Sequence, residues 1–163
     1  MKIERIWAMP NTATFRIRPV VALLNEYCRG KWLDPFCGGA RRATITNDLN
    51  PERSADFHDD AVDFLKRFVD ASVDGVLLDP PYSLHQVTRS YAGYGDKRVN
   101  ALTPVYDQCA RVVRPGGLVI HFGWNTNGAG AKRCFVIEHI LLVPHGGHHN
   151  DTIVTVERRL VTP

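Results

Sequence analysis

The sequence has no long apolar run, no strong excess of one charge and no paired cysteine motif. None of its hydrophobic stretches approaches the roughly 20 residues that a membrane-spanning helix needs. The first residues, MKIERIWAMPN, lack the apolar core of a signal peptide, so we expect no such leader. A net charge of +3 permits a polyanionic partner without demanding one, whereas a protein that coats DNA would be more basic. These absences argue against a membrane protein and against a purely electrostatic DNA binder.

The cysteines form no metal or redox motif, since no two of them are spaced as C-x-x-C. We interpret Cys28, Cys37, Cys109 and Cys134 as buried free thiols, which fits a reducing cytoplasm. Neither repeats nor low-complexity tracts are evident. With 163 residues, 44% of them hydrophobic and 23% charged, the chain can bury a core without staples. We therefore expect one cytoplasmic domain over residues 1–163.

Strand-like and helix-like patterns alternate along the chain, which predicts an α/β fold with a mainly parallel sheet. The last two strands are joined by a loop of about eight residues, which implies an antiparallel hairpin at the C-terminal end. The predicted helices cover residues 17–28, 59–69 and 102–113. The predicted strands cover residues 31–34, 43–49, 73–79, 118–122, 134–143 and 152–160.

Acidic side chains stand at the ends of several predicted strands. Asp34, Asp48 and Asp79 each end one, and the segment at residues 123–125 follows another. In open α/β sheets, ligands bind at the carboxyl ends of the parallel strands. A carboxylate is costly to place there unless it has a partner. We therefore expect these groups to share one ligand-binding edge.

The tetrapeptide Asp79-Pro80-Pro81-Tyr82 directly follows an apolar strand. In that position it resembles the D/N/S-P-P-Y/F/W signature of the DNA amino-methyltransferases. The resemblance implies a Rossmann-like methyltransferase fold, S-adenosylmethionine as the cofactor and these residues as the catalytic group. In that family an Asp at the head of the signature is associated with adenine. The alternative is an ordinary turn after a strand.

The chemistry of an exocyclic amine explains these residue types. The lone pair of the adenine amine is delocalised into the ring, so the amine is a poor nucleophile. The Asp79 carboxylate and the Pro80 carbonyl would accept its two N–H bonds, and two prolines would hold that carbonyl rigid. Tyr82 would stack on a base that has been flipped out of the helix.

The resemblance extends to a cofactor site. The segment DPFCGG at residues 34–39 resembles the D-P-F-x-G-x-G loop, in which the carboxylate and the glycine backbone face the methionine part of the cofactor and the Phe flanks its adenine. The Thr-Phe pair before the first predicted helix resembles the motif that receives the methionine carboxylate. The third glycine of the loop is absent here. The cofactor-binding residues that this implies are Thr14, Phe15, Asp34, Pro35, Phe36, Gly38, Asp48 and Asp60.

Two of these acids have plain alternatives. Asp48 matches the residue that binds the ribose hydroxyls, because a carboxylate can accept two hydrogen bonds, but it could simply be a turn residue. Asp60 matches the residue that accepts from the adenine amine, with Asp59 as a substitute. It could instead stabilise the start of a helix.

The connection between the first two strands is unusually short, with only about eight residues. Parallel neighbours normally need a crossover of a dozen or more residues, usually a helix. Either these strands are not neighbours, or the core is pared down to one turn at this point. Cofactor affinity is then in question. An apolar sheet face left bare would favour a homodimer.

No segment has the size of a target-recognition domain, so substrate contacts would come from loops at residues 84–100, 123–133 and 144–151. Basic residues interleaved with tyrosines in the first loop suit phosphate contact and base stacking. Each loop has a plain alternative. Residues 84–100 could be an ordinary solvated loop, Trp124 could be a core residue, and residues 144–151 could be a simple hairpin turn. The histidines of the last loop lack a fourth ligand, so we expect no metal. The candidate substrate-binding residues are Tyr82, Arg89, Trp124, Asn125 and His148.

The function we expect is methyl transfer from S-adenosylmethionine to the N6 amine of adenine in DNA. An RNA adenine or cytosine-N4 methyltransferase is the nearest alternative within the enzymes. A non-catalytic subunit that helps a partner bind nucleic acid is the alternative outside them.

Overall fold

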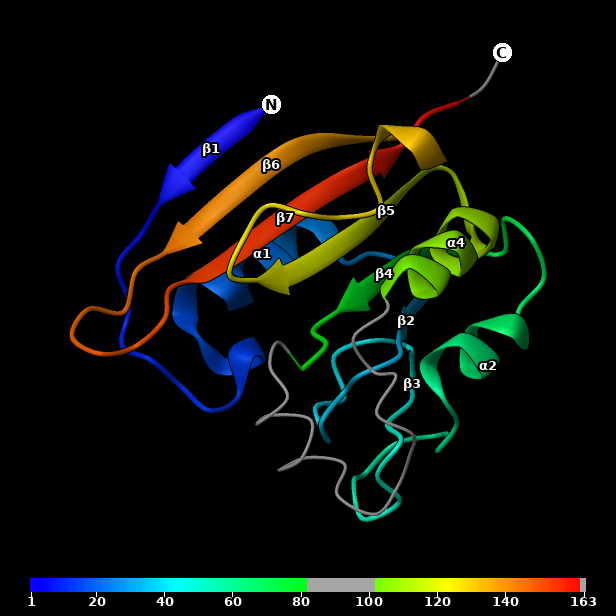
Figure 1. Ribbon diagram of the computed structural model, residues 1–163, viewed down its shortest axis with the longest axis horizontal. Helices are drawn as coiled ribbons and strands as arrows, with labels where there is room; N and C mark the ends of the chain where they lie inside the picture. The colour runs from blue at the N-terminus through cyan, green and yellow to red at the C-terminus, as the bar shows by residue number, and fades with distance from the viewer. Residues whose placement is uncertain (82–101, 162–163) are drawn as a thin grey trace.

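A seven-stranded sheet forms the centre of the computed structural model, which describes residues 1–81 and 102–161 (Figure 1). Its strand order is β1-β6-β7-β5-β4-β2-β3. The strands are β1 (Lys2–Arg5), β2 (Trp32–Asp34), β3 (Ile45–Thr46), β4 (Val73–Leu78), β5 (Val113–Gly123), β6 (Phe135–Val143) and β7 (Thr152–Arg159). The helices are α1 (Arg18–Tyr27), α2 (Ala61–Lys66) and α4 (Leu102–Val112), with short 3-10 helices η1 (Thr14–Arg16) and η3 (Ala131–Arg133).

The strand directions confirm the predicted α/β fold. Strands β3, β2, β4 and β5 are parallel neighbours in that order. Strand β7 is antiparallel to both β5 and β6, so β6 runs in the same direction as the parallel group. The carboxyl ends of β2, β3, β4, β5 and β6 therefore lie along one edge of the sheet, and the loop after β6 returns there.

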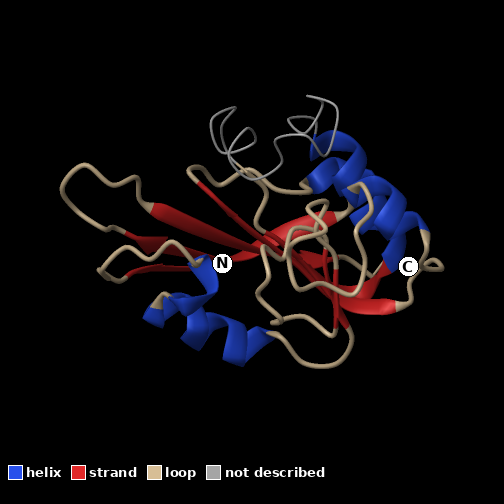
Figure 2. Cartoon of the chain, turned by 90° about the horizontal axis from the view of Figure 1, so that it is seen from below, coloured by secondary structure: helices blue, strands red, loops and turns tan. Residues whose placement is uncertain are grey.

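Helices cover both faces of the sheet (Figure 2). Helix α1 begins with a proline in its first turn and places Val20, Leu23 and Leu24 at helical spacing against one face. Helices α2 and α4 pack on the opposite face, where Phe64 and Cys109 belong to a second buried cluster. The centre of each predicted apolar stripe is buried, and Val21, Tyr27 and Phe68 at their margins are half-buried.

The largest differences from the prediction concern three strands, and α2 is also shorter than the predicted residues 59–69. Strand β1 was not predicted, since its KIER sequence has no apolar run. Strand β3 covers only Ile45–Thr46 instead of residues 43–49, and on its outer edge the Thr46 N–H donates to the Asp56 carboxylate at 2.8 Å. Strand β5 starts at Val113 instead of Leu118, because Val113 already pairs with Val73 before a bulge.

The first two strands of the predicted core are direct neighbours. Leu33 pairs with Ile45, and the residues between β2 and β3 form turns without a helix. Beside this short link, the sheet is covered at β2. Trp32 is only 2% exposed and lies across Gly75, where an added Cβ would come within 2.5 Å of its ring.

The cysteines are all free. Cys37 and Cys109 are buried as predicted, whereas Cys28 is half-buried and Cys134 is exposed. Among the residues that the structure describes, no helix has the length and hydrophobicity needed to cross a bilayer.

Candidate active site

Three carboxylates gather at the carboxyl edge of the sheet. Asp34 ends β2, Asp48 is the second residue after β3, and Asp79 comes directly after β4. The negative charges of Asp79 and Asp48 both raise the pKa of Asp34, so the three groups lie within electrostatic reach of one another. This arrangement agrees with the shared edge that the sequence predicts.

Asp34 is the most deeply buried of these acids. Its Oδ1 accepts a hydrogen bond from the Phe36 N–H at 3.0 Å, while its Oδ2 has no partner among the described residues. Burial raises the pKa of Asp34 well above its usual range, and the two neighbouring carboxylates add to that effect. A buried polar atom without a partner is rare and costly, which points to a ligand that completes it.

The glycine loop after β2 is held by Asp48. Its Oδ2 accepts from the Gly38 N–H at 2.8 Å and its Oδ1 accepts from the Asn50 N–H at 2.9 Å. Gly38 and Gly39 have φ angles of +57° and +91°, which an L side chain rarely adopts. Since Asp48 is only 2% exposed, its ribose assignment stays a prediction, and its role in this structure is to fix the loop.

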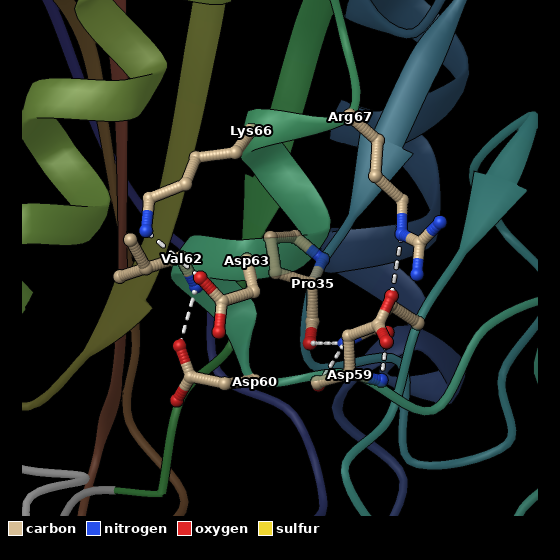
Figure 3. A network of polar contacts seen from close by, with 8 residues as sticks. Pro35, Asp59, Asp60, Val62, Asp63, Lys66 and Arg67 are labelled. Carbon is tan, nitrogen blue, oxygen red and sulfur yellow. Dashed lines mark hydrogen bonds and ion pairs between the residues drawn. The ribbon is translucent and has the colours of Figure 1, made fainter.

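Asn47 is a residue that we did not predict for this site. Its Nδ2 donates to the carbonyls of Pro35 at 3.1 Å and Asp59 at 3.0 Å, and its Oδ1 accepts from the Asp59 N–H at 2.9 Å. Figure 3 shows Pro35 and Asp59 facing each other across this network. One buried amide therefore ties the glycine loop to the segment that leads into α2. A polar residue directly after a strand was the available signal.

Asp60 caps the start of α2 in this structure. Its Oδ1 accepts from the Val62 N–H at 2.9 Å, and Asp59 instead pairs with Arg67 at 2.6 Å (Figure 3). The helix-start role that we kept as an alternative is therefore present. The adenine assignment of Asp60 stays a prediction.

The aromatic residues of the predicted cofactor site lie on opposite faces of the sheet. Phe15 packs on Phe122 with ring centroids 5.1 Å apart, which brings η1 and Thr14 to the carboxyl end of β5. Phe36 is half-buried against the cluster under α2 and α4.

The motif residues begin directly beyond β4. Asp79 and Pro81 are half-buried and Pro80 is buried. Tyr82 and Arg89 lie outside the described residues, as does the loop at residues 84–100.

Two further loops reach the same edge. Trp124, Asn125 and His148 are exposed there, as contact with a substrate requires. The histidine of this loop that makes internal contacts is His145. Its buried ring lies 2.9 Å from both the Ala8 carbonyl and the Thr152 hydroxyl. Within residues 1–81 and 102–161, no group of three or more His, Cys, Asp or Glu side chains could hold a metal ion.

The sequence also did not predict a pair of buried polar side chains, His121 and Thr155. The two residues lie side by side on β5 and β7, on the face that α4 covers, and the Tyr106 ring is 5.9 Å from the imidazole. Neither imidazole nitrogen nor the Thr155 hydroxyl has a well-formed hydrogen bond within the described chain. Burial lowers the pKa of His121 to about 4, and a weak approach to the Asn127 backbone opposes this only in part.

No model of a known protein family matches the chain, and no curated protein sequence matches it either. Several solved structures do resemble the chain. The methyltransferase yhhF from Escherichia coli has a TM-score of 0.58 at 12% identity over 93% of this chain and 89% of its own. The Burkholderia thailandensis 1,6-didemethyltoxoflavin-N1-methyltransferase, solved with S-adenosylhomocysteine, has a TM-score of 0.59 at 15% identity over 88% and 78%.

TrmN from Thermus thermophilus has a TM-score of 0.59 at 20% identity, over 91% of this chain and 51% of its own. At such identities the likeness concerns the fold. The chain thus has the fold of S-adenosylmethionine-dependent methyltransferases.

Proposed function

We propose that the chain is an S-adenosylmethionine-dependent methyltransferase that acts on the N6 amine of adenine in DNA. The observation that carries this proposal is the carboxyl edge itself. Asp34, Asp48 and Asp79 meet there, and the last of them opens the Asp-Pro-Pro motif. The fold agrees with methyl transfer in general, and the motif supports an amine as the acceptor.

The residues at this edge fit a cationic cofactor. S-adenosylmethionine carries a sulfonium and an ammonium group, and the buried Asp34 presents an oxygen that has no partner in the described chain. An added Cβ at Gly38 would meet no atom within 4 Å, so the loop backbone faces open space. Asp34, Phe36, Gly38 and Asp48 would hold the cofactor, which supplies an electrophilic methyl group when it is bound.

The chain's own contribution is to make the amine nucleophilic. The Asp79 carboxylate and the Pro80 carbonyl accept hydrogen bonds from the two N–H groups, which favours a tetrahedral nitrogen and frees its lone pair. Preorganised acceptors need little rearrangement during the reaction, and Pro80 and Pro81 restrict the backbone that carries one of them. Once the nitrogen is methylated, it loses a proton, and the Asp79 carboxylate is the nearest acceptor along the motif.

The test is transfer of a labelled methyl group from S-adenosylmethionine to duplex DNA, single-stranded DNA and RNA, followed by nucleoside analysis. We expect N6-methyladenine in DNA. N6-methyladenine in RNA alone, or N4-methylcytosine, would contradict the substrate while keeping the activity. Calorimetric binding of S-adenosylmethionine without transfer to any of the three would contradict the enzyme and favour a non-catalytic subunit.

A further inference from the structure

The carboxylate that the cofactor motif assigns to the ribose hydroxyls is closed off by the protein itself. Asp48 is only 2% exposed, and its two oxygens accept from the Gly38 and Asn50 N–H groups at 2.8 and 2.9 Å. A diol could reach this carboxylate only by displacing the backbone groups that it holds, and each of these would then lose its partner. The ribose of a cofactor at this edge therefore needs another acceptor close to Asp48.

His58 lies directly beside Asp48 at the carboxyl end of β3. The imidazole Nδ1 is 3.0 Å from the Asp48 carbonyl oxygen. Because a carbonyl oxygen can only accept, the proton of the neutral imidazole is on Nδ1, and Nε2 carries a lone pair. His58 is exposed, and its Nε2 has no hydrogen-bond partner among the residues that the structure describes. The ring thus presents a free acceptor to solvent at the edge where the ligand is expected.

The backbone that carries His58 is fixed on both sides of the residue. Before it, Phe57 forms a parallel bridge with Asn47, and the Phe57 carbonyl accepts from the Asp48 N–H at 3.1 Å. After it, the Asp59 N–H donates to the Asn47 side chain at 2.9 Å. Since the imidazole is also tethered through Nδ1, little freedom is lost when Nε2 accepts a hydrogen bond from a ligand.

The place of His58 along the edge suits the middle part of the cofactor. On one side, Asp48 holds Gly38, in the loop that is predicted to face the methionine part. On the other side, Asp60 follows two residues later at the start of α2 (Figure 3), where it is exposed and is the predicted acceptor for the adenine amine. The ribose joins these two parts of S-adenosylmethionine, so its hydroxyls need an acceptor between Gly38 and Asp60.

We infer that His58 binds a ribose hydroxyl of the cofactor, with the hydroxyl donating to Nε2, in place of the closed-off Asp48 carboxylate. Asp48 then acts through its two other contacts, because its carbonyl orients the imidazole and its carboxylate holds the glycine loop. The inference deepens the proposed function and rests on its cofactor, but it does not depend on which nucleic acid is methylated.

Calorimetry with S-adenosylhomocysteine on the full chain tests this inference without any need for methyl transfer. His58→Ala should weaken binding by about 2- to 10-fold, the range for one hydrogen bond between neutral groups. His58→Asn keeps an amide near the position of Nδ1 that can still donate to the Asp48 carbonyl, and it should bind as weakly as His58→Ala. His58→Gln places an oxygen near the position of Nε2 and should keep most of the affinity. His149→Ala, which truncates an exposed histidine after β6, is the matched control and should bind like the wild type.

The 2′-deoxy and 3′-deoxy forms of S-adenosylhomocysteine identify the group that His58 contacts. One of the two should bind the wild type more weakly than S-adenosylhomocysteine does, by a factor similar to the effect of His58→Ala. The same form should bind His58→Ala as well as S-adenosylhomocysteine does, because the hydrogen bond is already absent in that variant.

The outcomes separate this inference from the proposed function. Wild-type affinity in His58→Asn with a loss in His58→Gln would make the imidazole only a support for Asp48, and would overturn the inference. Equal affinity of the wild type and His58→Ala would overturn it as well, as would penalties for both deoxy forms that persist in full in His58→Ala. The expected binding pattern without methyl transfer to any nucleic acid would support His58 and contradict the proposed function. A wild type that does not bind S-adenosylhomocysteine would overturn both.

Discussion

Two acids at opposite edges of the sheet, Asp74 near the amino end of β4 and Asp34 at the carboxyl end of β2, differ in character. At the amino end, Asp74 accepts from the Lys31 N–H at 2.6 Å and from the Arg114 guanidinium at 2.8 Å. These contacts, the Lys31 N–H first, lower the pKa of Asp74 below its usual range. Just past the carboxyl end, Asp79 lies near Asp34, a buried acid whose pKa is raised.

The difference separates a stabilising role from a ligand-binding role. Asp74 is satisfied by the protein and adds to its stability. Asp34 keeps one oxygen unsatisfied, which costs stability unless a ligand completes it. The same residue type thus has two roles, and its end of the strand decides which.

The largest expected effect is that of Asp79→Ala on methyl transfer. Loss of a preorganised acceptor should lower kcat by about 10²- to 10³-fold, because the amine then loses one of the two groups that activate it. Single-turnover assays measure the rate, and calorimetry should show that the affinity for S-adenosylmethionine is nearly unchanged. The matched control is Asp74→Ala, on the same strand, which should keep its activity. Full turnover by Asp79→Ala would refute the mechanism.

The next effect concerns the pH dependence of stability at the carboxyl end of β5. The pKa of His121 is about 4 in the folded state against ~6.5 when unfolded, so protons bind the unfolded chain first. His121 should therefore destabilise the fold as the pH falls from 6.5 to 4, by roughly 3 kcal/mol at the lower end. Urea unfolding at several pH values should show this slope in the wild type and a shallower one in His121→Leu. Parallel slopes would contradict the assignment.

A smaller effect is expected for Asp48→Ala on cofactor binding. The substitution leaves the Gly38 and Asn50 N–H groups without their acceptor, so the loop after β2 loses its support. The affinity for S-adenosylmethionine should fall by about 5- to 150-fold, as for a loss of roughly 1–3 kcal/mol. Calorimetry decides, and an unchanged dissociation constant would refute both the ribose contact and the loop-holding role.

The smallest effect contrasts Asp34→Asn with Asp74→Asn. Because burial raises the pKa of Asp34, ionising this carboxyl destabilises the fold, increasingly as the pH rises through the raised pKa and less as it falls. Asp34→Asn should thus stabilise the protein at pH 7 by about 1 kcal/mol, whereas Asp74→Asn should destabilise it by a similar amount. Thermal unfolding compares them, and shifts of the same sign would break the contrast between the two sites.

Local patterns along the chain were enough to identify most strands and helices of the core, because these elements carry their own apolar period and several end near a Gly or Pro. They also predicted that Asp34, Asp48 and Asp79 share an edge, since parallel strands bring their carboxyl ends together. The motif at Asp79-Pro80-Pro81 is local by nature and was visible in the sequence.

Long-range pairing settled what these patterns left open. The short link from β2 to β3 joins direct neighbours, which only the register of Leu33 with Ile45 establishes. Strand β1 has no apolar run, and it exists because β6 offers an edge to pair with. The roles of Asn47 and His121 depend on partners and burial far away in the chain. Periodicity reports which residues form an element, whereas hydrogen bonds and burial between distant residues exist only once the chain has folded.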